Sequence, residues 1–347
     1  MKKVVAAIDS FKGCLRSVEA NAAAAAGVRD VWPDAKVQEV TVSDGGEGFM
    51  EAWEAAIGGE IRSVQVHDPL MREVSAKYLL NGETAVIEVA EACGLWRLKP
   101  EERNPLVATS YGVGEMVADA VKNGAKTIIV GLGGSGTSDA GKGMVEGLGE
   151  LRVKSEELRI IIATDVENPL CGEYGAAAVY GPQKGATAEM VKELDKRAKA
   201  FAEESAKRMG FDRSEEKGAG AAGGLGYAFM QYMHAERRSG IDLLLETIHF
   251  DNLTQDADLV ITGEGAADRQ TLMGKLPVGI LRHSGKAPVC LIAGKISDRE
   301  ALLQARFAEA ECINPPHLAL EEAMRPDVAK QNIRNCVARI VSKRSEL

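Results

Sequence analysis

Two different patterns divide this sequence, and the change from one to the other constrains the fold most. The first and last parts of the chain alternate short apolar runs with amphipathic stretches, which is typical of an α/β sheet. Strands are expected at 3–8, 37–42, 258–263, 288–293 and 310–313, and helices at 17–30, opened by Ser17, at 47–57, 274–284, 299–309 and from Ile333 to Val341. Fully apolar strands indicate a parallel sheet that is buried on both faces. We therefore expect one doubly wound parallel sheet assembled from both ends of the chain.

The middle of the chain has the second pattern, in which apolar and polar side chains alternate. Such alternation, joined by short turns, predicts an antiparallel meander. The meander is expected at 61–66, 74–80 and 84–90, followed by a helix at 112–123 and strands near 127–131 and 159–164. The two patterns together predict an α/β domain with a mixed sheet, residues 59–240, inserted into a domain made of 1–58 and 241–347. The cleft between two such domains is a common place for a ligand.

The composition fits a soluble two-domain enzyme. The chain has 347 residues, and domains usually have roughly 100 to 200. Hydrophobic residues at 45% and charged residues at 27% exclude disordered and collagen-like classes. A net charge of −9 argues against a nucleic-acid partner, and no apolar run approaches the roughly 18 residues that span a membrane. Six scattered cysteines without a C-x-x-C pair suit a reducing cytoplasm, which is the expected location.

Four apolar strands are followed by an acidic residue. These residues are Asp9, Asp44, Asp165 and Glu264, and three of them belong to the same predicted parallel sheet. In open α/β sheets the ligand crevice lies outside the carboxyl ends of the strands. A single such residue can simply cap the next helix, but a group of carboxylates at a crevice suits Mg²⁺ or a base that accepts a hydroxyl proton.

Glycine-rich loops accompany these acidic residues. Gly131–Gly136 and Gly218–Gly223 both match G-x-G-x-x-G, and backbone N–H groups of such loops can hold phosphate. Tight packing is the other explanation for each loop, because a chain with 37 glycines matches this pattern by chance. A P-loop is excluded at Gly136–Lys142, since Gly143 stands where Ser or Thr must contact Mg²⁺.

Several basic residues are candidates for binding anions. Lys184 and Lys275 lie in glycine-flanked loops, where an ammonium group can approach a phosphate, although each could equally be a solvated surface lysine. Arg103 and Arg269 could clamp a substrate carboxylate through two hydrogen bonds. The five histidines have neither metal-ligand spacing nor a G-x-S-x-G motif, so a hydrolase triad is unsupported.

Eight motifs together resemble those of the bacterial glycerate kinases of type I. In chain order they are DSFKG at 9–13, SDGGEG at 43–48, GLGGSGTSDAG at 131–141, ATDVENPLCG at 163–172, GPQKGA at 181–186, GAGAAGGLG at 218–226, ITGEG at 261–265 and DRQTLMGK at 268–275. The resemblance covers nearly the whole chain. It implies a discontinuous flavodoxin-like domain with an inserted domain similar to the restriction-endonuclease fold. It also implies phosphorylation of glycerate, with ATP and Mg²⁺, favouring 2-phosphoglycerate as the product.

The resemblance also implies which residues surround the ligands. It carries over to Asp9, Ser10, Lys12, Asp44, Glu47, Ser135, Asp139, Asp165, Lys184, Glu264, Asp268 and Lys275. Combined with their positions, we hypothesise four groups of site residues. They are Asp44, Asp165, Lys184 and Lys275 for catalysis; Asp9, Ser10, Lys12, Arg103, Asp268 and Arg269 for the substrate; Gly133, Gly134, Ser135, Gly136 and Asp139 for the nucleotide; and Asp44, Asp165 and Glu264 for the metal.

The sequence departs from the family pattern in places and leaves alternatives open. Ile8, Ser43, Phe49 and 138–141 differ from the usual residues, and the segments near 150–158 and 210–217 are shorter than usual. A kinase for another small hydroxy acid or sugar acid is one alternative. An NAD(P)-dependent oxidoreductase is disfavoured because Asp165 follows Gly136 by 29 residues rather than about 20. A two-domain sensor that closes on a carboxylate ligand is a further alternative, but the acidic residues at the strand ends would be unnecessary there and would repel the ligand. Substrate stereochemistry, 2- or 3-phosphorylation and a homodimer all stay open.

Overall fold

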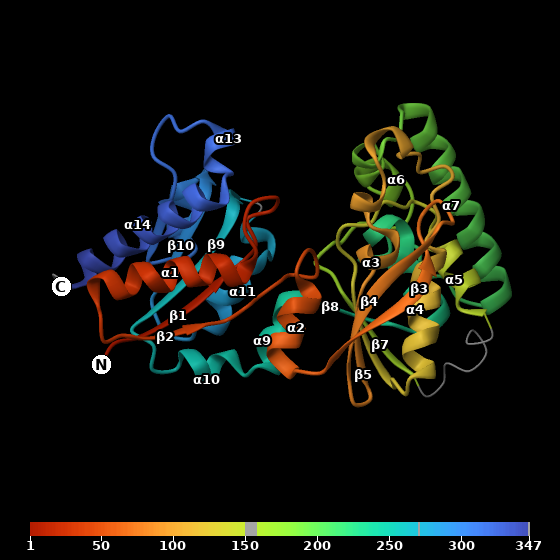
Figure 1. Ribbon diagram of the computed structural model, residues 1–347. Helices are drawn as coiled ribbons and strands as arrows, with labels where there is room; N and C mark the ends of the chain where they lie inside the picture. The colour runs from red at the N-terminus through yellow and green to blue at the C-terminus, as the bar shows by residue number, and fades with distance from the viewer. Residues whose placement is uncertain (150–157, 270, 346–347) are drawn as a thin grey trace. The chain divides into compact units, whose positions relative to one another are not determined.

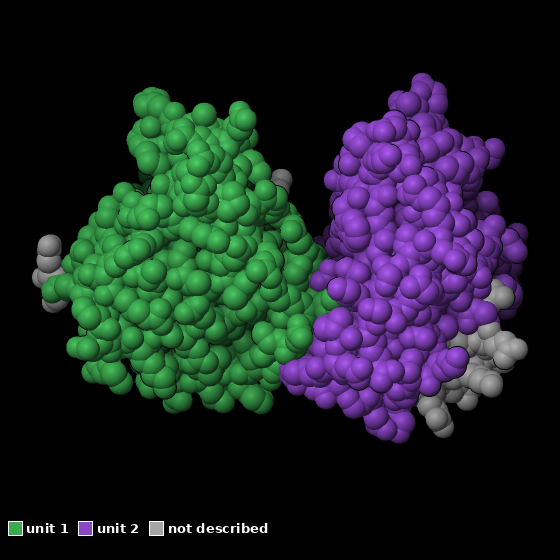
Figure 2. All heavy atoms as spheres, viewed as in Figure 1, with its two compact units in different colours: residues 1–56, 241–347 green, residues 57–240 purple. Residues whose placement is uncertain are grey.

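The chain folds into two compact units. The structure is a computed structural model and describes residues 1–149, 158–269 and 271–345, so the short segment expected near 150–158 lies almost wholly outside the described residues. Unit 1 contains Met1–Ala56 and Ile241–Leu347, and unit 2 contains Ile57–Gly240 (Figure 2). Across the described residues, no helix combines the length and the apolar character needed to cross a membrane.

The sheet of unit 1 is parallel throughout, as the sequence predicts. Its strands are β1 (Lys3–Ile8), β2 (Lys36–Glu39), β9 (Leu259–Ala267), β10 (Val289–Ile296) and β11 (Glu309–Cys312). Their order is β11-β10-β9-β1-β2 (Figure 1). Counted within the unit, this is the 2-1-3-4-5 order of flavodoxin-like folds, whose topological switch point lies between the first and third strands. Here that point lies between β1 and β9.

Helices cover the sheet of unit 1. They are α1 (Ser17–Val31), α2 (Phe49–Ile57), α9 (Gly240–Thr247), α10 (Phe250–Thr254), α11 (Leu276–His283), α12 (Arg299–Gln304), α13 (Leu320–Ala323) and α14 (Pro326–Ser345). Helices α1 and α14 lie side by side (Figure 1), and their apolar faces share a core with β1. At Gly27, where they meet, a Cβ atom would lie 2.3 Å from the Arg334 carbonyl oxygen. Glycine therefore permits this close packing.

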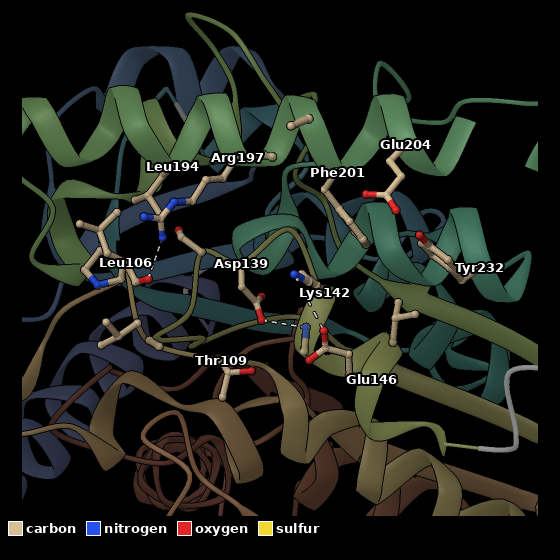
Figure 3. Close-up of a pocket in the computed structure, with 18 of the residues that line it drawn as sticks. Leu106, Thr109, Asp139, Lys142, Glu146, Leu194, Arg197, Phe201, Glu204 and Tyr232 are labelled. Carbon is tan, nitrogen blue, oxygen red and sulfur yellow. Dashed lines mark hydrogen bonds and ion pairs between the residues drawn. The ribbon is translucent and has the colours of Figure 1, made fainter. Parts of the chain in front are cut away.

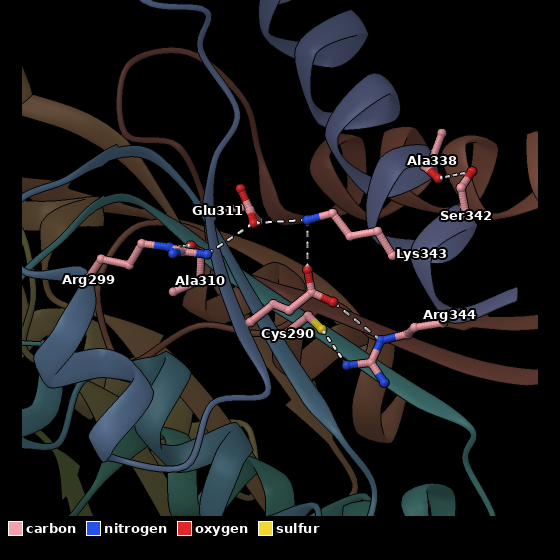
Figure 4. Close-up of polar contacts among 9 residues, drawn as sticks. Cys290, Arg299, Ala310, Glu311, Ala338, Ser342, Lys343 and Arg344 are labelled. Atoms are coloured by element: carbon pink, nitrogen blue, oxygen red, sulfur yellow. Dashed lines mark hydrogen bonds and ion pairs between the residues drawn. The ribbon is translucent and has the colours of Figure 1, made fainter. Parts of the chain in front are cut away.

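An ion-pair network joins the end of α14 to the edge of the sheet (Figure 4). Lys343 Nζ lies 3.3 Å from carboxylate oxygens of both Glu309 and Glu311, and Arg344 Nε lies 3.6 Å from Glu309. Lys343 is 59% exposed, so its two pairs contribute little each, whereas Arg344 and Glu309 are mostly buried. The effect of these pairs is to hold the last turn of α14 over β11.

Unit 2 has a mixed six-stranded sheet with the predicted meander at one side. Its strands are β3 (Glu60–His67), β4 (Glu73–Asn81), β5 (Thr84–Glu88), β6 (Thr127–Gly131), β7 (Arg159–Ala163) and β8 (Glu236–Arg238), in that order. Pairs β3–β4 and β4–β5 are antiparallel, and the other pairs are parallel. The helices are α3 (Ala90–Cys93), α4 (Tyr111–Lys122), α5 (Lys142–Gly147), α6 (Ala176–Tyr180), α7 (Ala188–Met209) and α8 (Leu225–Met233). The fold class is as predicted, whereas strand β8 and the long helix α7 were not predicted.

Some local predictions for unit 1 are wrong. The second strand ends at Glu39 rather than residue 42, because side chains of α1 bind the following backbone: Asn21 donates to the Val40 carbonyl and Ser17 Oγ accepts from Val42 N–H. For the same reason Ser17 does not cap α1, whose N-cap position is Arg16. The helix expected at 299–309 ends at Gln304. Glu264 lies within β9 rather than after it.

Candidate active site

A cavity of about 450 Å³ opens at the carboxyl ends of the strands of unit 1. Its charged and hydroxyl-bearing lining residues include six that the sequence predicts. They are Asp9, Ser10, Lys12, Asp44, Glu264 and Lys275, with Lys295 added by the structure. Asp9 follows β1 directly and Glu264 lies in the neighbouring β9. The two acidic side chains therefore flank the topological switch point, where ligands of this fold class bind.

Two carboxyl groups of this cavity, those of Asp9 and Glu264, lie in an environment that disfavours their charge. Asp9 is 8% exposed, and burial, followed by the nearby Asp44 carboxylate, raises the pKa of Asp9 to about 8. Burial also raises the pKa of Glu264. Carboxyl groups with raised pKa values in a cleft are typical of active sites. A cation or a proton bound there would relieve both the burial cost and the mutual repulsion.

Thr271 holds Glu264 in place and was missed by the sequence analysis. Its Oγ1 donates to Glu264 Oε1 at 2.6 Å and accepts from the Asp268 N–H at 3.0 Å. The other oxygen of Glu264, Oε2, lies 3.9 Å from Lys275 Nζ. Thr271 is completely buried, so its hydroxyl is a permanent part of the site. The only signal in the sequence was its place inside the motif DRQTLMGK.

Other predicted residues of unit 1 differ in their surroundings. Ser10 Oγ is buried and has no hydrogen-bond partner among the described residues, which leaves it able to bind a ligand in the cavity. Asp268 supplies the N–H that binds Thr271. Arg269 does not line the cavity: its side chain is 80% exposed and its Nε donates to Asp298 at 2.6 Å.

In unit 2, Lys184 is buried against the glycine-rich loop that follows β6. Its side chain donates from Nζ to Ser135 Oγ at 3.0 Å and to the Thr137 carbonyl at 2.6 Å, and the residue is only 2% exposed. Burial lowers the pKa of Lys184 to about 8, an effect partly offset by charges that include Asp139. A buried cation that holds a loop in this way braces the backbone and adds positive potential beside it.

The carboxylate of Asp139 forms hydrogen bonds within unit 2. Its Oδ2 accepts hydrogen bonds from the Ser110 N–H and hydroxyl and from the Gly143 N–H, and its Oδ1 accepts from the Gly141 N–H. This carboxylate thus holds the start of α5. In the preceding loop, Gly136 N–H donates to the Cys93 carbonyl and the Gly134 carbonyl accepts from Leu95. Gly133 is half-buried and Gly134 is exposed, which leaves this turn at the surface of the unit.

The second glycine-rich loop packs against the first. A Cβ atom at Gly223 would lie 2.0 Å from the Thr137 carbonyl oxygen, and one at Gly226 would lie 2.0 Å from the Gly218 carbonyl oxygen. Gly223 also has a φ of +71°, which favours glycine. These contacts support the packing explanation for this loop.

Two further predicted site residues, Asp165 and Arg103, also belong to unit 2. Asp165 is half-buried and follows β7 after one intervening residue. Arg103 packs beside the turn after Lys184, since a Cβ atom at Gly185 would lie 2.7 Å from the Arg103 carbonyl oxygen.

Of the three predicted metal ligands, Asp44 and Glu264 are in unit 1 and Asp165 is in unit 2. Within the described ranges, no group of three or more His, Cys, Asp or Glu side chains is placed to hold a metal ion.

Unit 2 contains a second cavity, of about 630 Å³, below helix α7 (Figure 3). Arg197 and Phe201 of α7 and Lys142 and Glu146 of α5 line it together with Asp139. Several ionic groups at its edge already have partners: Lys142 faces Glu146 at 4.0 Å, Arg197 donates to the Leu106 carbonyl, and Arg208 lies over the Tyr232 ring. We therefore regard the cavity of unit 1 as the better candidate for the chemistry.

Known proteins resemble this chain over nearly its full length. The model of the glycerate kinase family matches residues 4–155 and 150–344. A glycerate kinase of Bacillus subtilis (strain 168) is 39% identical over 353 residues, covering 92% of each chain. A glycerate 2-kinase of Escherichia coli (strain K12) is 39% identical over 327 residues, covering 85% of this chain and 86% of its own. The crystal structure of a provisionally named glycerate kinase 2 from Salmonella typhimurium LT2 is 36% identical, with a TM-score of 0.84 over 99% of this chain and 98% of its own.

Proposed function

Because this chain belongs to the glycerate kinase family, we propose that it transfers the terminal phosphoryl group of ATP to glycerate and forms 2-phosphoglycerate. The relatives are phosphotransferases that act on an alcohol group, and this chain is an enzyme of the same class. The observation that carries the proposal is the cavity of unit 1, in which buried carboxyl groups and lysines meet at the switch point of the sheet.

The charges of that cavity suit phosphoryl transfer. This reaction depends on positioning the reactants and on neutralising charge on the phosphates. Lys12 and Lys275 line the cavity and supply ammonium groups for phosphate oxygens. Asp44 and Glu264 have the hard oxygen donors that Mg²⁺ prefers, so these two residues of unit 1 fit this metal. The metal role of Asp165 stays a prediction from the sequence. Bound Mg²⁺ would polarise the phosphoryl group and neutralise its charge.

Asp9 is the residue that we propose to orient the glycerate hydroxyl group and to accept its proton. Its pKa of about 8 is close to the operating pH, which is the range in which a general base works best. The neighbouring Ser10 Oγ, buried without a partner among the described residues, can bind the same hydroxyl group or the substrate carboxylate.

The first experiment identifies the product. We would incubate the protein with ATP, Mg²⁺ and D-glycerate, add enolase alone, and follow phosphoenolpyruvate by its absorbance. An immediate signal is expected, because enolase converts only 2-phosphoglycerate. A signal that needs added phosphoglycerate mutase would mean 3-phosphorylation, and absence of ADP release would exclude glycerate and leave another hydroxy acid or sugar acid as the acceptor.

Thr271→Val is expected to lower kcat about tenfold, because it removes one hydrogen bond from Glu264, worth about 1 kcal/mol or more. The buried Thr271 hydroxyl binds the carboxylate at 2.6 Å, so valine also raises the pKa of Glu264 further. Thr271→Ser keeps the hydroxyl and should restore most of kcat. Steady-state kinetics at several Mg²⁺ concentrations would measure both variants. Equal losses in Thr271→Val and Thr271→Ser would contradict a positioning role for the hydroxyl group.

A further inference from the structure

The cavity of unit 1 has an apolar wall that the reaction of glycerate does not explain. One part of the lining carries the carboxylates and lysines described above, near β1 and β9. The other part is apolar and comes from the loop after β1, the end of β11 and helix α13. Its members are Phe11, Ile313, Leu320, Ala323 and Met324. Glycerate is a three-carbon acid with an oxygen on every carbon, so it has no apolar group to place there.

Two side chains of this wall are exposed although they are large and apolar. Leu320 is 74% exposed and Met324 is 41% exposed, and both lie on or directly after the short helix α13. Behind them, Phe11 and Ile313 are almost fully buried and form the base of the wall. Exposed apolar side chains beside a cavity commonly indicate a surface that a ligand covers.

We propose that this apolar wall binds the nucleoside of the phosphoryl donor. The inference rests on the proposed kinase function and identifies which part of unit 1 would hold which part of ATP. A nucleoside triphosphate has a flat, largely apolar base at one end and phosphates at the other, which matches a cavity with one apolar and one charged part. Its volume of about 450 Å³ lies within the range of roughly 300–1,000 Å³ found for pockets of drug-sized ligands.

Asn314 supplies a polar group at the same place. Its Nδ2 donates to the Gly294 carbonyl at 2.8 Å and its Oδ1 accepts from Asn332 at 3.1 Å. These bonds fix the amide plane and use one of the two Nδ2 hydrogens. Since Asn314 lines the cavity beside Ile313, the second hydrogen can bind an acceptor nitrogen or oxygen of the base.

The test changes the exposed part of the wall and leaves the charged part intact. In Leu320→Glu the side chain becomes an anion at the site proposed for an apolar base. We expect KM for ATP to rise at least fivefold, KM for glycerate to stay within twofold, and the affinity for ADP measured by calorimetry to fall by a similar factor. Leu303→Glu is the matched control, because Leu303 is another exposed leucine of unit 1 outside this cavity. Thermal unfolding would confirm that both variants fold.

The outcomes separate this inference from the proposed function. If Leu320→Glu changes KM for glycerate and not KM for ATP, the wall faces the acceptor and the inference is wrong. Unchanged kinetics and unchanged ADP affinity would also overturn it. The wild-type protein could fail to phosphorylate glycerate while the Leu320→Glu variant binds ADP more weakly than the wild type does. In that case the acceptor assignment fails and the nucleoside site stands. Phe11→Leu, which keeps an apolar side chain in the base of the wall, should weaken ADP binding less than Leu320→Glu.

Discussion

Asp9→Asn is expected to lower kcat by about 10²- to 10⁴-fold, the range that a general base contributes. Asparagine keeps the shape of the side chain and can still accept the hydrogen bond that Asp9 Oδ1 receives from the Ser10 N–H at 2.7 Å. The amide cannot accept the proton of the glycerate hydroxyl group. The loss should therefore appear in kcat, with only small changes in the KM values.

The same variant is expected to be more stable than the wild type at pH 8 in metal-free buffer. In the unfolded chain Asp9 ionises near pH 4, whereas in the folded protein its pKa is about 8. Between these values the folded state binds the extra proton, so the stability of the wild type relative to Asp9→Asn falls by up to about 1.4 kcal/mol per pH unit as pH rises. Below pH 4 the carboxyl group is neutral in both states, so the difference in stability between the two proteins no longer changes with pH.

Chemical denaturation of both proteins in EDTA, at several pH values from 4 to 9, measures this difference. Asp34→Asn is the matched control, because Asp34 is an exposed aspartate of the same unit. Asp34→Asn removes no buried carboxyl group, so it should not reproduce the gain in stability at pH 8. A loss of activity in Asp9→Asn without any gain in stability at pH 8 would contradict the burial cost assigned to Asp9.

Lys184→Met is expected to reduce kcat/KM by at least a hundredfold while the protein stays folded. The change removes the buried ammonium group that binds Ser135 and the Thr137 carbonyl. The positive potential beside the loop at Gly133 and Gly134 is then lost. The cost in stability at pH 7 should be small, within about 2 kcal/mol, because removing a desolvated charge offsets the lost hydrogen bonds.

The pH dependence of stability should also differ in a defined direction. Burial lowers the pKa of Lys184 from 10.5 to about 8, so above pH 8 the folded state releases a proton that the unfolded chain still holds. The wild type should therefore gain stability relative to Lys184→Met as pH rises from about 8 to 10.5. Below pH 8 both states are protonated and the difference is constant.

Kinetics and denaturation of Lys184→Met and Lys196→Met test this prediction. Lys196 is an exposed lysine of the same unit, and its replacement should leave kcat/KM and the free energy of unfolding unchanged. We propose that the loop binds an oxyanion, which is either a nucleotide phosphate, as the sequence suggests, or the glycerate carboxylate. A larger rise in KM for ATP would identify the phosphate, and a larger rise in KM for glycerate the carboxylate. Full activity in Lys184→Met would show that the lysine serves packing alone.

The interactions that complete the site could not be derived from sequence patterns. Lys184 and Ser135 are 49 residues apart in the chain, and no local periodicity connects them. Asp139 was predicted to bind the nucleotide, and only the structure reveals that its carboxylate accepts hydrogen bonds from Ser110, Gly141 and Gly143. Thr271 was missed because a threonine in a loop motif has no distinctive pattern until its partner, Glu264, is known.

Local patterns in the sequence predict every strand except β8, the fold class and the acidic residues that meet in unit 1. They also predict six of the helices, namely α1, α2, α4, α11, α12 and α14. Periodicity and strand-end residues are local properties, and parallel strands bring their carboxyl ends to one edge of the sheet. Asp9, Asp44 and Glu264 therefore share a cavity, as this rule predicts. The burial of these groups, the hydrogen bonds that hold them, and the apolar wall from β11 and α13 that completes the cavity are visible only in the folded structure. Those features depend on contacts between segments distant in the chain, which set the solvation and the pKa values.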